Sequence, residues 1–218
     1  MKSKNVDIFQ HDSCTEEYDS WVQNESNPMR AGYKQTLNWV ADVSNVHNPK
    51  IILEMGSGTG TLTQQLKNYD TIVCVDASIE MIKQAKNKLL NLDKIHYKLC
   101  DFLEFFDSNT NKFEMIVSTY ALHHLTEEEK ELFFQNAIST LEPNGHIIIG
   151  DIMFFDQEKK NEIIQFYKKE DQKEVLELIK TQYFWDISQT KTTLGKLGFS
   201  CREFQFSQLS WGLDCFKA

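Results

Sequence analysis

The segment from Ile52 to Gly60, ILEMGSGTG, constrains this chain more than any other feature. An apolar run typical of a buried strand leads directly into glycines at 56, 58 and 60, and a helix-like pattern follows over residues 61–68. Because glycine lacks Cβ, a backbone with this spacing turns tightly and lets a ligand come close. A strand, a glycine turn and a helix in this order predict the first unit of a nucleotide- or nucleoside-binding α/β sheet.

The spacing of the glycines bears on the ligand. A turn that binds a pyrophosphate favours glycines at its first, third and sixth places, whereas here the third glycine comes one residue early and Thr61 fills the sixth place. Together with Glu54, two residues before the first glycine, this spacing favours an adenosyl ligand without phosphates. A tight turn with no ligand is the alternative interpretation.

Strand-like and helix-like patterns alternate beyond this turn. We expect strands at 51–55, 71–75, 95–99, 113–119 and 146–150, and helices at 61–68, 78–90 and 127–141, with a turn at 143–145. Strands that are apolar throughout fit burial on both faces, and helical crossovers between them are right-handed. The pattern therefore predicts an α/β fold: a mostly parallel sheet with helices on both faces.

The 218 residues suggest a single domain, 1–218. Within it we expect a helical N-terminal lid (1–48), divided at Pro28, and a ligand-binding core (49–151). A charged, amphipathic helical cap (152–186) follows, and then a last helix with a closing hairpin (187–218). The two runs of that hairpin are separated only by Leu209 and Ser210, so they predict an antiparallel pair.

Charge and hydropathy limit the classes of partner that this chain is expected to bind. The net charge of -9 disfavours nucleic acid, which binds basic surfaces. No apolar run has the length of a membrane span, and the N-terminus lacks the apolar core of a signal sequence. We therefore expect a small-molecule partner, neither nucleic acid nor membrane, and a monomer or homodimer.

Cysteines and histidines lack the spacing of a metal site. The five cysteines, at 14, 74, 100, 201 and 215, include no C-x-x-C motif, which favours free, buried thiols and a cytoplasmic location. His123 and His124 are adjacent, but no second ligand set with zinc spacing accompanies them. We accordingly expect no metal cofactor.

Further candidate residues follow the next strands. Asp76 ends the second strand, twenty residues after Gly56, where a carboxylate accepts hydrogen bonds from ribose hydroxyls. Asp101 and Phe102 follow the third strand, and the run 118–125 follows the fourth. The carboxyl ends of parallel strands meet at one edge, so these residues are predicted to line one pocket. Simpler roles remain open: Asp76 as a helix cap, and Asp101 as a turn residue.

At these residues the chain resembles the class I S-adenosylmethionine (SAM)-dependent methyltransferases. Glu54-x-Gly56-x-Gly58-x-Gly60 is similar to the first motif of the family, and Val75-Asp76-x-Ser78-x-x-Met81 to its ribose-binding turn. Asp101-Phe102 is similar to the adenine-binding motif. Residues 118–125 and 141–145 match later landmarks, with Asn144 where glycine is common. The resemblance is tight over about residues 50–151. It is strongest to small bacterial YrrT-like methyltransferases.

The resemblance implies a Rossmann-like, seven-stranded, mostly parallel sheet whose last strand is antiparallel. It also implies that SAM is the cofactor and S-adenosylhomocysteine (SAH) the product. A contact of Tyr18 with the cofactor follows from the Tyr18-Asp19 pair in the lid. The implied cofactor-binding residues are Glu54, Gly56, Ser57, Gly58, Gly60, Asp76, Ala77, Met81, Asp101, Phe102, Thr119 and Tyr18.

A sulfonium methyl group is already activated, so the protein mainly has to place an acceptor in line with the S–CH₃ bond and exclude water. No catalytic side chain is obligatory; where a base is needed, the candidates are Asp151, His123, His124 and Tyr120. Aromatic residues of the cap predict a small, partly apolar acceptor. Two other functions stay open at this point: a non-catalytic SAM-binding or regulatory protein, and an NAD(P)-dependent oxidoreductase.

Overall fold

The structure is a computed structural model that describes residues 1–5, 15–89 and 93–218, and the side chains of residues 15–17 are not described. Cys14 and Leu90, which belong to the predictions above, lie outside this part of the chain. The helices and short 3₁₀ turns are α1 (Thr15–Val22), α2 (Tyr33–His47), η1 (Thr63–Gln65), α3 (Ile79–Lys88), α4 (Phe102–Ser108), η2 (Leu122–His124), α5 (Glu127–Thr140), α6 (Gln157–Lys169), α7 (Lys173–Thr181) and α8 (Ile187–Lys196).

The strands form one sheet in the order β3-β2-β1-β4-β5-β8-β7, with the two-residue β6 paired to the end of β5. Strands β1 to β5 pair in parallel, whereas β8 is antiparallel to both β5 and β7. The predicted α/β architecture with a closing antiparallel hairpin is therefore confirmed. The strand bounds are β1 (Ile51–Met55), β2 (Thr71–Asp76), β3 (Ile95–Leu99), β4 (Phe113–Thr119), β5 (Leu141–Phe154), β6 (Trp185–Asp186), β7 (Phe199–Gln205) and β8 (Ser210–Lys217).

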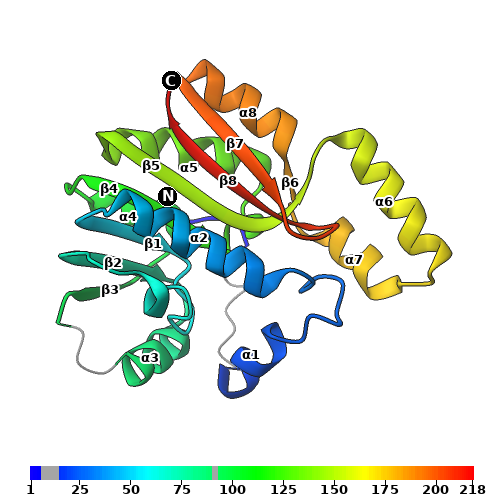
Figure 1. Ribbon diagram of the computed structural model, residues 1–218, viewed down its shortest axis with the longest axis horizontal. Coiled ribbons are helices and arrows are strands. Elements are labelled where there is room, and N and C mark those ends of the chain that lie inside the picture. Colours follow the sequence, from blue (N-terminus) through cyan, green and yellow to red (C-terminus); the bar gives the residue numbers. More distant parts are fainter. Residues whose placement is uncertain (6–14, 90–92) are drawn as a thin grey trace.

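Helices cover both faces of the sheet (Figure 1). One buried cluster joins α2 to alternate residues of the strands and extends to α6 and α7. The other cluster joins the opposite strand positions to α4, α5 and α8. Alternation along the strands explains the division: Ile52 belongs to the first cluster and Leu53 to the second, because successive side chains point to opposite faces.

Helix α2 lies across the first face and holds the N-terminal region against the sheet. Its buried residues Tyr33, Leu37, Val40 and Ala41 recur at helical spacing and form one apolar stripe. The helix approaches the sheet closely at Gly150: a Cβ built there would lie 2.5 Å from the Thr36 methyl group and 2.9 Å from Val40. Small residues in the strands thus set how near α2 lies to the strand ends.

Two local predictions are wrong. The segment predicted as a helix over 61–68 forms only the 3₁₀ turn η1, because Leu66 turns to an extended conformation and enters the first buried cluster. The turn predicted at 143–145 lies within β5, which begins at Leu141 and shifts its register against β4 between Phe113 and Met115. A strand irregularity therefore replaces the predicted turn.

The prediction that the cysteines are free is also wrong for two of them. Cys201 on β7 lies directly opposite Cys215 on β8, and the two form a disulfide with a Cα–Cα distance of 4.2 Å. The antiparallel register brings together residues 14 apart in sequence, which cysteine spacing alone does not reveal. Cys74 and Cys100 are free.

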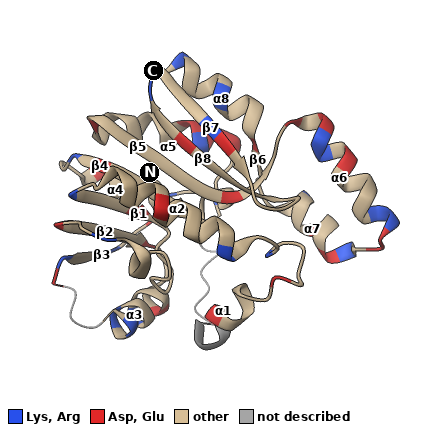
Figure 2. Cartoon of the chain, viewed as in Figure 1, with Lys and Arg blue, Asp and Glu red and all other residues tan. Residues whose placement is uncertain are grey.

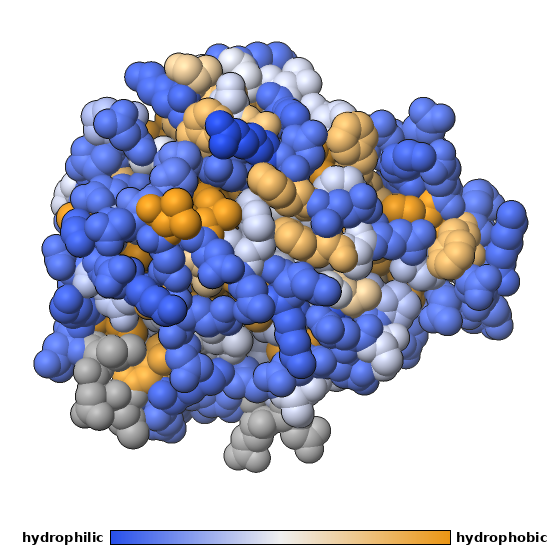
Figure 3. Space-filling view, in the orientation of Figure 1, coloured by the Kyte–Doolittle hydropathy of each residue, from blue (hydrophilic) through white to orange (hydrophobic). Residues whose placement is uncertain are grey.

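Acidic and basic residues are interspersed over the helices, most densely on the projecting helix α6, whereas the strands carry few of them (Figure 2). The face in view is largely hydrophilic with scattered apolar residues (Figure 3). Within the described ranges, no helix combines the length and the apolar character needed to cross a bilayer.

Candidate functional site

A pocket lies at the carboxyl ends of β1 to β4, and its empty space of about 690 Å³ includes open solvent. Nine of the twelve residues predicted to bind the cofactor line it. These are Tyr18, Gly56, Gly58, Asp76, Ala77, Met81, Asp101, Phe102 and Thr119. Tyr120 and His124, two of the four candidate bases, also line it, together with Ser3, Ser78, Ala121 and Leu125. The strand ends therefore bring the predicted residues together.

The glycine turn forms the floor of the pocket. Gly56 has a φ of 72°, in the left-handed region, and its N–H donates to the Val75 carbonyl over 2.8 Å. A Cβ at Gly56 would lie 2.3 Å from the Cβ of Ala121, so this position accepts no side chain. Gly58 also has a positive φ, and a Cβ there would meet nothing within 4 Å. The backbone of the turn thus faces open space on the ligand side.

Asp76 fastens this turn to the end of β2. One carboxylate oxygen accepts the Gly58 N–H over 2.8 Å, and the other accepts the Ser78 N–H over 2.9 Å. Ser78 caps α3, because its hydroxyl accepts the Met81 N–H. The helix-cap role that was the alternative for Asp76 therefore belongs to Ser78. A carboxylate offers about four lone-pair sites in all, and Asp76 lines the pocket wall.

Asp101 already has several hydrogen-bond donors. It caps α4 through the N–H groups of Leu103 and Glu104 and forms a capping box with Glu104. Ser3 adds its N–H at 3.0 Å and a short hydrogen bond from its hydroxyl. Ser3 is not among the residues that the sequence predicts for the pocket, because no local pattern links it to Asp101, 98 residues away. The first residues of the chain thus cover this end of the pocket.

Three of the predicted cofactor residues, Glu54, Ser57 and Gly60, do not line the pocket. Glu54 is buried behind the turn, where its carboxylate accepts the Thr63 hydroxyl over 2.7 Å. Burial raises the pKa of Glu54 to about 7, although hydrogen bonds from Thr63 and Cys74 act in the opposite direction. Gly60 packs against the side chain of Leu89. These residues support the turn from behind.

Helix α1 closes one side of the pocket. Tyr18 lines it, and the neighbouring Asp19 accepts the Thr59 hydroxyl over 2.5 Å and pairs with Lys88 over 2.6 Å. Burial opposes ionisation of Asp19, but Lys88 and Thr59 hold its pKa below the usual value. The carboxylate therefore links the N-terminal lid to both the glycine turn and α3.

His123 and Asp151, two of the candidate bases, lie behind the pocket wall and bind each other. The Nδ1 of His123 is 2.6 Å from Asp151, which also accepts the N–H groups of His123, Ile152 and the Trp185 indole. Burial would raise the pKa of Asp151, but His123 and Trp185 hold it below its usual value. This arrangement ties η2 to β5 and β6, which is a positioning role.

Tyr120 and His124 face the pocket. Tyr120 has a φ of 50°, rare for a residue with a side chain, and its hydroxyl bonds to the hydroxyls of Thr36 and Ser210. Burial raises the pKa of Tyr120, so this phenol keeps its proton at neutral pH. Of the two candidate bases that line the pocket, the phenol of Tyr120 keeps its proton, which leaves the imidazole of His124 as the candidate.

Arg30 lies beside Tyr120, in the segment between α1 and α2. Its guanidinium carbon is 4.5 Å from the centre of the Trp21 ring and 5.6 Å from that of Tyr120. Its Nε and Nη1 atoms are buried and have no hydrogen-bond partner within the described residues. A guanidinium with unpaired N–H groups favours an anionic partner such as a carboxylate or phosphonate.

Comparison with known proteins agrees with this geometry. A family model described as a methyltransferase domain matches residues 52–145. An uncharacterised methyltransferase of Oceanobacillus iheyensis is 34% identical over 186 residues, which cover 85% of this chain and 84% of that protein. An uncharacterised methyltransferase of Anoxybacillus flavithermus is 30% identical over 216 residues, 97% of each chain.

Solved structures share the fold at low sequence identity. The DhpI–SAH complex matches with a TM-score of 0.69 at 17% identity, over 98% of this chain and 95% of that one. Magnesium protoporphyrin IX methyltransferase from Synechocystis with bound SAM matches with a TM-score of 0.70 at 16% identity, over 99% and 98%. The similarities favour methyl transfer over both alternative functions. The chain belongs to the class I SAM-dependent methyltransferases and is an enzyme of that family.

Proposed function

We propose that the pocket at the strand ends binds SAM and that the enzyme transfers its methyl group to a small molecule, leaving SAH. The observation that carries the proposal is the convergence of Gly58, Asp76, Asp101 and Thr119 on one pocket. In this assignment the glycine turn and Thr119 contact the methionyl part and Asp76 accepts the ribose hydroxyls. Solved neighbours that hold SAM or SAH support the same choice of cofactor.

The adenine end involves an exchange of partners. Asp101 would accept the adenine amino group, and the Phe102 ring would contact the base. Ser3 now donates two hydrogen bonds to that carboxylate, so the first residues of the chain have to share it or move aside when the cofactor enters. Residues 1–48 would thereby act as the lid and residues 152–186 as the cap of a single domain.

Methyl transfer would proceed by in-line displacement at the sulfonium. The nearby carboxylates of Asp76 and Asp101 favour the cationic cofactor electrostatically, and the apolar residues of the wall would help to exclude water once the ligands are bound. His124 would accept a proton when the acceptor atom carries one, because its side chain is at the pocket wall. Tyr120 would orient the acceptor, while His123 and Asp151 would hold the η2 turn in place.

The acceptor in this proposal is a small, partly apolar molecule with an anionic group. Tyr120 lines the pocket, and Arg30 lies behind it, between the Tyr120 and Trp21 rings. The unpaired Nε and Nη1 of Arg30 would attract a carboxylate or phosphonate to this side of the pocket. The solved neighbour magnesium protoporphyrin IX methyltransferase supports a small-molecule acceptor for this fold.

The acceptor prediction is tested by measuring SAH release from SAM with a panel of small carboxylic and phosphonic acids and their neutral amides. We expect turnover with acids. Replacing Arg30 by glutamine should then lower kcat/KM by about 10–100-fold, since a charge-assisted hydrogen bond contributes about 1.5–3 kcal/mol. SAM affinity should not change. The matched control is Arg202→Gln, at an exposed arginine on β7.

Two results would contradict the acceptor proposal: turnover restricted to the neutral amides, or an Arg30→Gln variant with unchanged kcat/KM for an acidic acceptor.

The cytoplasmic location is a further proposal. The free thiols of Cys74 and Cys100 support it, whereas the Cys201–Cys215 disulfide does not.

A further inference from the structure

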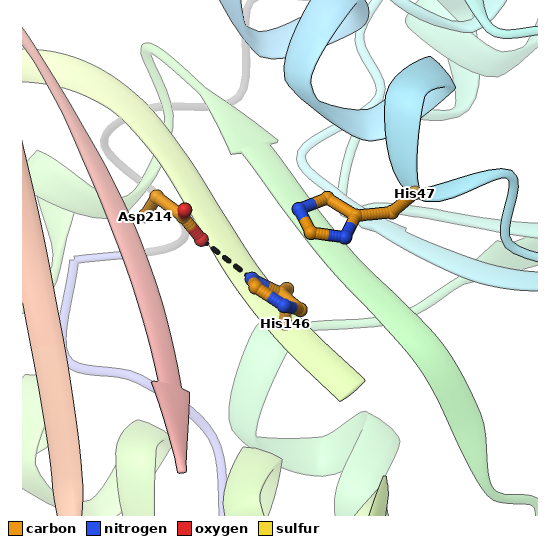
Figure 4. A group of neighbouring side chains, drawn as sticks. All are labelled: His47, His146 and Asp214. Carbon is orange, nitrogen blue, oxygen red and sulfur yellow. Dashed lines mark hydrogen bonds and ion pairs between the residues drawn. The ribbon is translucent and has the colours of Figure 1, made fainter. Parts of the chain in front are cut away.

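A second group of chemically reactive side chains lies at the opposite edge of the sheet. His47 ends α2, His146 lies near the start of β5, and Asp214 is on β8 (Figure 4). Their donor atoms all lie within 4.8 Å of one another. Gly150 of β5 pairs with Thr119, which lines the pocket. His146 comes four residues before Gly150 and therefore lies farther from the pocket, toward the amino end of β5. Methyl transfer as proposed above uses none of the three residues.

The fold sets these side chains on one face. His146 and Asp214 project from neighbouring antiparallel strands toward α2, and His146 Nδ1 is 2.7 Å from the Asp214 carboxylate. The rings of His47 and His146 lie with their centres 3.9 Å apart. His47 is exposed and lies in the last helical turn, and one of its ring nitrogens already lies within 4.8 Å of the other two donor atoms.

The charge balance also favours a cation. Asp214 is only 5% exposed, and within the described residues its carboxylate has no hydrogen-bond partner besides the His146 ring. The carbonyl groups at the end of α2 add partial negative charge beside His47. Arg202 lies opposite Asp214 in the register of β7 and β8, and its positive charge would repel a bound cation. Its side chain is exposed, however, and lies over the Phe216 ring. Its side chain can therefore remain in solvent when a metal is bound.

We propose that His47, His146 and Asp214 form a binding site for a divalent transition-metal ion, Zn²⁺ being the best match. Two imidazoles and one carboxylate are ligands that zinc accepts, at about 2.0–2.2 Å, whereas Mg²⁺ and Ca²⁺ prefer oxygen ligands alone. Three protein ligands leave a fourth, solvent-facing position for water. The ion would join the end of α2 to β5 and β8.

Such a clamp acts on a helix that also contacts a residue of the pocket wall, Tyr120. At its other end α2 carries Thr36, whose hydroxyl bonds to Tyr120. Metal binding would hold α2 against the sheet and stabilise the fold, with no part in the transfer step. The proposal is therefore independent of the cofactor and acceptor assignments.

The test uses the full-length protein after treatment with a chelator. We expect titration calorimetry to detect one Zn²⁺ per chain, and Co²⁺ to give the visible absorption of a protein-bound ion. Zn²⁺ should also raise the Tm by a few degrees at saturation. His47→Ala and Asp214→Asn should each weaken Zn²⁺ binding by at least about 100-fold, because even outer partners of metal ligands affect affinity by 10–100-fold.

The matched control is His96→Ala, at an exposed histidine on β3, which should bind Zn²⁺ like the wild type. His47 is exposed, so its replacement leaves the core intact, and circular dichroism verifies the fold. The proposal is overturned if no saturable Zn²⁺ binding is found, or if binding survives unchanged in His47→Ala.

Discussion

Replacing Gly56 by alanine is expected to weaken SAM binding by about 100-fold or more, equivalent to roughly 3 kcal/mol. The new Cβ would lie 2.3 Å from the Cβ of Ala121 and 3.4 Å from the Phe102 ring, so the floor and the wall of the pocket have to separate. The residue would also keep a φ of 72°, which costs a side-chain-bearing residue about 1–2 kcal/mol. Titration calorimetry with SAH measures the loss.

The chain contains a matched control for this glycine. Gly195 lies in α8, a Cβ there meets nothing within 4 Å, and its φ is outside the left-handed region. Gly195→Ala should bind SAH like the wild type and gain about 0.5–1 kcal/mol in stability. An SAH affinity of Gly56→Ala within a factor of three of the wild type would refute the role of this turn.

Glu54→Gln is expected to make the protein more stable than the wild type at pH 8, but not at pH 4.5. Burial raises the pKa of Glu54 to about 7 from its usual value of 4.5. The wild type therefore loses stability as the pH rises from 4.5 to 7, because only the unfolded chain releases this proton readily. This difference in pKa corresponds to a loss of about 3 kcal/mol in the free energy of unfolding. Glutamine keeps the shape and the bond from Thr63 without the charge.

Urea denaturation of both proteins at the two pH values measures this difference, and other groups that titrate in both proteins cancel. Glu142→Gln, at an exposed position, is the control and should change stability by less than about 0.5 kcal/mol at either pH. A difference between Glu54→Gln and the wild type that does not vary with pH would show that Glu54 is not a buried, weakly acidic group.

The sequence allowed prediction of those parts of the site that follow from strand order. Gly56, Asp76, Asp101 and Thr119 each stand where a parallel strand ends, and such ends meet at one edge of a sheet. The periodicity of the strands also predicted the sheet and its closing hairpin. No contact between distant segments was needed for these inferences.

The remainder depends on tertiary contacts that local patterns do not encode. Ser3 reaches Asp101 only because the chain returns over the pocket, and His123 binds Asp151 because η2 packs against the end of β5. The Cys201–Cys215 disulfide and the histidine and aspartate cluster at the far edge depend on the register of β8. Sequence spacing alone indicates neither the partners nor the exposure of these side chains.

The most direct test of the central assignment is calorimetric titration of SAM, SAH and NADH into the wild type and Asp76→Ala. We predict saturable binding of SAM and SAH at one site per chain and none of NADH. Asp76→Ala should weaken SAH binding by about 1–3 kcal/mol, because its bonds to the ribose hydroxyls are lost. Binding of NADH alone, or an unchanged SAH affinity in Asp76→Ala, would contradict the assignment.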